Sequence, residues 1–149
     1  MTDTSFATSF EVDRTPDEVF KAITDVRGWW TGEVAGGTER LGDEFTYRYA
    51  DLHSSRQRVT DLVPGRRVAW QVLDARLAFA GDPHEWAGTQ IVFDIVPAGE
   101  RTEVRFAHVG LVPGLDCFDN CAAGWSFFIG SSLKRRITTG EGPTVPPWA

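Results

Sequence analysis

A change in hydrophobic period most constrains what this chain can fold into. Between residue 6 and residue 109, several short segments carry apolar side chains at every second position, the pattern of strands that bury one face. From 116 to 138 the apolar residues recur instead at the spacing of an amphipathic helix. A sheet with one apolar face must be covered. The pattern therefore predicts an α+β fold in which a sheet packs against one long helix.

Turn signals divide the first part of the chain into six or seven strands. Short connections typical of hairpins join most of them, so the sheet should be antiparallel. Segment 74–88 has no sustained period and is expected to be a long excursion with a short extended piece at 77–79. The expected strands are 6–12, 32–35, 44–50, 54–63, 66–73, 89–96 and 102–109.

Two helices are expected. Residues 15–18 read Thr-Pro-Asp-Glu, a sequence that suits a capping box, and Gly28 is expected to end this first helix in the left-handed conformation. The second helix should cover 116–138. It contains Gly124 and Gly130 in its interior, where glycine costs about 1 kcal/mol relative to alanine, so these two positions are expected to give room to a cavity or a neighbouring backbone.

Length and charge restrict the class of protein. The chain has 149 residues, which predicts a single domain, 1–149. Its formal net charge of -6 has the wrong sign for a partner that binds nucleic acid through phosphates. The sequence has no apolar run of about 18 residues and no signal-peptide layout at its start, so we expect no membrane insertion and a cytoplasmic location.

Several short motifs occur in a characteristic order. They are Trp29-Trp30, Val63-Pro64-Gly65, Val68-Ala69-Trp70, Glu85-Trp86-Ala87-Gly88-Thr89, Phe106-Ala107-His108-Val109-Gly110-Leu111 and Thr139-Gly140-Glu141-Gly142-Pro143. The order and the motifs resemble the START-like, or SRPBCC, superfamily. Within it they resemble a branch of small bacterial proteins similar to the C-terminal domain of the ATPase activator of the ninety-kilodalton heat-shock chaperone.

The resemblance implies a helix-grip fold, an antiparallel sheet of six to seven strands wrapped on a long C-terminal helix with a cavity between them. It implies as function the binding of a small apolar or amphipathic molecule in that cavity. A chaperone partner is the first alternative, although the eukaryotic activators carry an additional docking domain for which this length leaves no room. The second alternative is a cyclase-like enzyme in which His108 moves a proton in the same pocket.

Candidate ligand-binding residues are mostly aromatic and face inward in this arrangement. An ordinary filled core is the competing interpretation of the same aromatic residues. His108 shares an inward strand face with Phe106, and Trp86 is expected to close the pocket mouth. The candidates are Trp30, Phe45, Tyr47, Trp70, Trp86, Phe93, Phe106, His108, Cys121 and Trp125.

Metal and cofactor chemistry have little support in the sequence. Cys117 and Cys121 lie four residues apart and could share zinc with His108 and His53, but structural zinc sites usually use two tight cysteine pairs. We therefore expect free thiols, no metal and no cofactor. His53 and His84 are expected at the surface. The sequence contains no nucleophile elbow, zinc-protease motif or phosphate-binding glycine loop, so catalysis is not the leading expectation.

Phe127 lies on the side of the last helix that faces away from the sheet. An aromatic residue there needs a cover, which either the tail 144–149 or a second copy of the chain could supply. The tail is the favoured cover, and a homodimer is the alternative.

Overall fold

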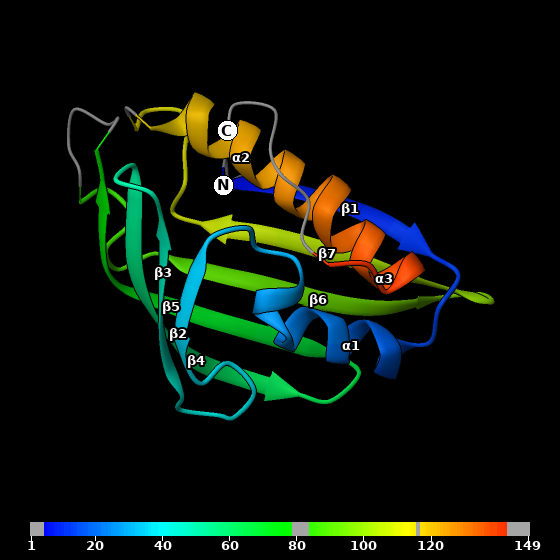
Figure 1. Cartoon of the computed structure of the whole chain (residues 1–149). Helices are drawn as coiled ribbons and strands as arrows, with labels where there is room; N and C mark the ends of the chain where they lie inside the picture. Colours follow the sequence, from blue (N-terminus) through cyan, green and yellow to red (C-terminus); the bar gives the residue numbers. More distant parts are fainter. Residues whose placement is uncertain (1–4, 79–83, 116, 143–149) are drawn as a thin grey trace.

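The computed structural model describes residues 5–78, 84–115 and 117–142, which form one curved sheet with its helices on a single face (Figure 1). In chain order the elements are β1 Phe6–Val12, α1 Pro16–Thr24, a 3-10 turn at Val26–Gly28, β2 Glu33–Gly36, β3 Glu44–Tyr49, β4 His53–Val63, β5 Arg67–Leu77, β6 Gln90–Ala98, β7 Arg101–Val109, α2 Phe118–Phe127, a π-helical segment at Phe128–Leu133 and α3 Lys134–Thr139.

The sheet has seven strands in the order β1-β7-β6-β5-β4-β3-β2, and every neighbouring pair is antiparallel. Alternation along each strand places the apolar stripes on the helix-covered face, as in β5, where Val68, Trp70 and Val72 are buried. The predicted α+β, antiparallel helix-grip arrangement is thereby confirmed.

Strand β5 is longer than the sequence indicates. It continues to Leu77 because β4 begins as early as His53, and the two residues pair directly. Ala75 and Leu77 are buried at alternate positions, but two apolar residues are too few to reveal a period. The expectation that an excursion begins at residue 74 is therefore wrong. Residues 79–83 of that excursion lie outside the described part of the chain.

Helix α1 begins as expected, with Thr15 and Glu18 forming a reciprocal capping box. It ends at Thr24, however, and the expected left-handed stop at Gly28 is wrong. Gly28 ends the 3-10 turn, where a Cβ atom would lie 2.8 Å from both Arg136 Nε and Asp25 Oδ2. Glycine is needed there for close approach, because the Asp25–Arg136 ion pair at 3.0 Å joins the first and last helices.

The last helix covers Phe118 to Thr139 without a break and ends at Gly140 in the left-handed conformation. Its middle, Phe128–Leu133, is π-helical, whereas the sequence predicts a regular α-helix. The i→i+5 bonding of a π segment widens the turn and rotates the side chains that follow, which a periodicity argument assumes constant. Ile129, Leu133 and Ile137 stay buried against the sheet despite this rotation.

Phe127 is half-buried and packs at the margin of the core, with its ring 5.4 Å from that of Phe128. The tail that is expected to cover it, residues 144–149, lies outside the described residues. Within the described ranges, no helix is both long and apolar enough to cross a membrane.

Candidate functional site

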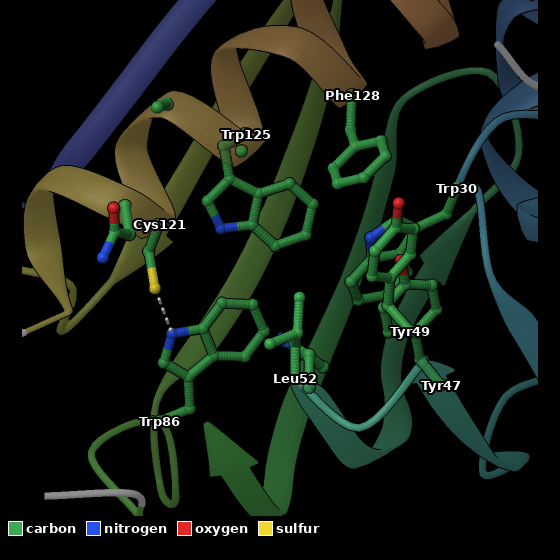
Figure 2. A pocket seen from close by; sticks show the side chains of 12 residues that line it. Trp30, Tyr47, Tyr49, Leu52, Trp86, Cys121, Trp125 and Phe128 are labelled. Carbon is green, nitrogen blue, oxygen red and sulfur yellow. Dashed lines mark hydrogen bonds between the residues drawn. The ribbon is translucent and has the colours of Figure 1, made fainter. Parts of the chain in front are cut away.

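A pocket of about 350 Å³ lies where α2 approaches the turn between β3 and β4 (Figure 2). Ligand pockets for small molecules begin at about this size and are mostly apolar with a few polar groups. The lining residues are Trp30, Tyr47, Tyr49, Leu52, His53, Trp86, Asn120, Cys121, Ala123, Gly124, Trp125 and Phe128.

Aromatic rings make the walls of this pocket. Figure 2 shows Trp86 and Trp125 on one side and Trp30 with Tyr47 on the other, with Leu52 between them. Trp86 and Trp125 are stacked with centroids 5.7 Å apart and planes 11° apart. Trp30 and Tyr47 stack at 3.8 Å and 10°. The rings of Trp30 and Trp125 lie 5.1 Å apart, so the two pairs are in contact, and each of the four rings is at most 3% exposed.

Local structure fixes each of these rings. Trp86 sits in a tight turn, where the Thr89 N–H donates to its carbonyl, and its indole Nε1–H donates to Cys121 Sγ at 3.3 Å. Cys121 and Trp125 are four residues apart on α2, so they share one face of the helix. Tyr47 faces inward on β3 and donates its phenolic proton to the carbonyl of Thr31. Burial raises the pKa of this phenol.

Gly124 creates part of the open space. It lies in the interior of α2 and lines the pocket, and a Cβ atom added there would meet no atom within 4 Å. The expectation that this glycine gives room to a cavity agrees with that geometry. Gly130 also has open space at its Cβ position, but it does not line the pocket.

Five of the ten sequence-predicted site residues line the pocket, namely Trp30, Tyr47, Trp86, Cys121 and Trp125. The other five lie behind the wall in the packed core, where Phe45, Trp70, Phe93, Phe106 and His108 are each at most 1% exposed. Strand alternation predicts correctly that they face inward. It cannot tell which inward residues meet the cavity, because that depends on where the helix leaves the sheet uncovered.

His108 has both ring nitrogens engaged behind Trp125. The indole Nε1–H of Trp125 donates to Nδ1 at 2.9 Å, so in the neutral ring Nε2 carries the proton and donates to Thr89 Oγ1 at 2.8 Å. The Thr89 hydroxyl in turn donates to the Trp86 carbonyl at 2.6 Å. His108 therefore holds both wall tryptophans in place and does not itself reach the pocket.

His53 is the histidine that the pocket exposes, which corrects the expectation that it lies at the surface. Its ring is surrounded edge-on by those of Trp86, Tyr47 and Trp30, with centroids 4.6, 5.1 and 6.1 Å away. Burial lowers the pKa of His53 to about 3. Burial, with a smaller effect from His53, also lowers the pKa of His108 to about 3. His84 is exposed, as expected.

The inner face of β4 carries a polar stripe of His53, Ser55 and Gln57 in an otherwise aromatic interior. Ser55 Oγ lies 3.0 Å from His53 Nε2 and accepts from Gln57 Nε2 at 2.5 Å. Among buried side-chain polar atoms of the described residues, Gln57 Oε1 and Trp70 Nε1 have no partner. Gln57 and Trp70 lie on the inner face of the adjacent strands β4 and β5, so this part of the core contains two polar atoms without a hydrogen-bond partner.

His108, which is fully buried, and His53, which is partly buried at the pocket, predict a pH dependence of stability. Folded, they stay neutral down to about pH 3, whereas unfolded they bind protons near their ordinary pKa of 6.5. The unfolded state therefore takes up more protons as the pH falls, and the free energy of unfolding should drop below pH 6.5 by up to about 1.4 kcal/mol per pH unit for each histidine.

Urea unfolding at about pH 7.5 and about pH 5.5 measures this dependence. His53→Phe should reduce the slope. Equal free energies of unfolding at the two pH values in the wild type would contradict the assignment of imidazoles that stay neutral in the folded protein.

Cys117 and Cys121 are both buried and not joined by a disulfide. The hydrogen bond between the two thiols, together with burial, raises the pKa of Cys117. The same hydrogen bond and the one from Trp86 lower the pKa of Cys121. The backbone N–H of Cys117 donates to Glu85 Oε1 at 3.0 Å, which fixes the start of α2 against the segment that carries Trp86.

We expect two free thiols per chain. In the folded protein Cys117 is 0% and Cys121 6% exposed, so both should react slowly with a thiol reagent. After unfolding without reductant both should titrate at once. A single reactive thiol, or none, would show a disulfide or a modified cysteine and contradict the expectation.

No group of three or more potential metal-ligating side chains gathers anywhere in ranges 5–78, 84–115 and 117–142. Elemental analysis of the purified protein tests the expectation of no metal, and stoichiometric zinc would overturn it.

Seven residues that line the pocket are not among the sequence-predicted site residues. They are Tyr49, Leu52, His53, Asn120, Ala123, Gly124 and Phe128. Gly124 is not predicted to line the pocket, but its position inside a helix does indicate a need for space. Tyr49, Leu52 and His53 carry no comparable signal in the sequence, because the exposure of Leu52, 46%, is known only from the structure.

The sheet, the covering helix and the pocket between them define a helix-grip, START-like domain. The chain belongs to the family of Activator of Hsp90 ATPase homolog 1-like proteins, whose model matches residues 13–138. No functionally curated protein matches the sequence.

Solved structures share the fold over nearly the whole chain. The Aha1 dimer of Colwellia psychrerythraea, solved in solution, is 27% identical with a TM-score of 0.74, covering 93% of this chain and 98% of that one. DynU16, from the dynemicin biosynthetic locus, is 23% identical with a TM-score of 0.68 over 95% of this chain and 49% of that one. CalU16 from Micromonospora echinospora is 18% identical with a TM-score of 0.66, covering 97% and 78%.

Proposed function

We propose that residues 1–149 form a single domain that binds a small apolar or amphipathic molecule in the pocket between the sheet and α2. The observation that carries the proposal is an aromatic-walled space of about 350 Å³ that the fold leaves open despite a densely packed core beside it. A helix-interior glycine with empty space at its Cβ position supports it, because glycine costs stability there and contributes room.

Extraction tests this proposal on the protein as purified. Organic extraction followed by mass spectrometry should recover an apolar metabolite in near-stoichiometric amount, and removing it should restore binding of an added apolar probe. Failure to recover a metabolite and failure of the stripped protein to bind any apolar probe would together overturn the proposal.

A chaperone-activating role is the second candidate, supported by the family match and by the similarity to the Aha1 protein. It would use a protein-binding surface instead of the pocket. Stimulation of a heat-shock chaperone ATPase by the chain would support it, and a variant with a filled pocket should then stimulate equally well. The solved Aha1 relative is a dimer, so the oligomeric state of this chain should be measured in the same experiment.

Cyclase-like catalysis is the least supported alternative. It would need a titratable group at the reacting atoms, and both nitrogens of His108 are engaged with Trp125 and Thr89. His108 also lies outside the pocket lining. The geometry therefore favours binding over proton transfer at this residue.

A further inference from the structure

We propose that the pocket selects an uncharged, flat aromatic ligand with one hydrogen-bonding group, which binds the free ring nitrogen of His53; this rests on the proposed binding function. Three features of the wall carry the inference: its lack of charge, the shape of its rings and the hydrogen-bonding state of His53.

Charge is missing from the wall. None of the twelve described residues that line the pocket is Asp, Glu, Lys or Arg. A carboxylate or ammonium entering this space would lose its hydration without finding an opposite charge, which is costly.

His53 cannot provide a counter-charge. Its ring is packed among Trp86, Tyr47 and Trp30, and burial keeps it neutral at physiological pH. Its Nε2 pairs with Ser55 Oγ, and within the described residues Nδ1 has no protein partner. The imidazole therefore offers a neutral hydrogen-bonding atom at the pocket, besides the amide of Asn120 and the phenol of Tyr49 in the same lining.

The rings favour a flat ligand. Trp86 stacks on Trp125 and Trp30 stacks on Tyr47, so each wall is built from a pair of parallel rings (Figure 2). Aromatic ligands gain from offset-stacked or edge-to-face contact with such walls beyond the area they bury. A branched aliphatic ligand of equal size gains only the burial.

A matched series of naphthalenes separates these features. Calorimetric titration at neutral pH should show 2-naphthol binding at least about tenfold more tightly than 2-naphthoate and 2-naphthylmethylammonium, because only the neutral compound keeps its solvation cost low. Unsubstituted naphthalene should bind more weakly than 2-naphthol by a few fold. The adamantane analogue 1-adamantanol should bind more weakly than 2-naphthol.

Two variants assign the polar contact. His53→Phe should remove the preference for 2-naphthol over naphthalene while retaining naphthalene binding, and His84→Phe, at an exposed histidine, should preserve the preference. Equal affinity for 2-naphthoate and 2-naphthol would overturn the selection for neutral ligands and leave the proposed binding function standing. A preference for 2-naphthol that survives His53→Phe would overturn the assigned contact. Absence of binding by every neutral probe would overturn both the inference and the proposed function.

Discussion

Trp125→Ala is expected to lower the free energy of unfolding by about 3–5 kcal/mol, the range for deleting a large aromatic side chain from a core. Trp125 is 2% exposed and contacts the rings of Trp30, Trp86 and Phe106. Its loss enlarges the pocket and leaves Nδ1 of His108 without the indole donor. Urea unfolding followed by circular dichroism measures the change.

Trp125→Phe serves as the control for this prediction. It keeps most of the ring contact but removes the N–H, so it should cost less than the alanine variant, about 1–3 kcal/mol for a buried acceptor left unpaired. A loss under about 1 kcal/mol for Trp125→Ala would show that α2 does not depend on this contact and contradict the described packing.

Gly124→Leu is expected to abolish ligand binding without destabilising the fold. The new side chain would project from a position that lines the pocket and has no atom within 4 Å of its Cβ, so it can occupy the ligand's space without an initial clash. Leucine also favours the helix over glycine by up to about 1 kcal/mol. Affinity for a neutral aromatic probe should fall more than about tenfold while the unfolding midpoint holds or rises.

Gly130→Leu is the matched control, since Gly130 is also a helical glycine with open space but does not line the pocket. It should bind the probe like the wild type. Unchanged binding in Gly124→Leu would mean that the probe binds elsewhere, and equal losses in both variants would mean that the effect comes from the helix and not from the pocket.

Much of the fold is predictable because its signals are local. The capping residues Thr15 and Glu18, the alternation in β5 and the helical spacing after Leu111 each depend on near neighbours in the chain. The end of α1 and the π-helical segment are not predictable in this way. Gly28 lies against Arg136, more than a hundred residues away, and the sequence of Phe128–Leu133 contains no local signal that marks a π-helical segment.

The sequence predicts which residues face inward, but it does not predict which of them line the pocket. Alternation places Phe93, Phe106 and His108 inward, and all three are buried. Which inward residues meet the cavity depends on the turn after Tyr49, because it brings Leu52 and His53 opposite Trp86. A contact between segments so distant in sequence has no periodic signature, so the roles of His53 and His108 could not be distinguished beforehand.

Titration with N-phenyl-1-naphthylamine, a neutral fluorescent probe, tests the central claim most directly. The pocket between sheet and α2 predicts saturable fluorescence enhancement at one site per chain, displaced by 2-naphthol and lost in Gly124→Leu but retained in Gly130→Leu. Enhancement that never saturates, or that is equal in the two glycine variants, would contradict a binding function for this pocket.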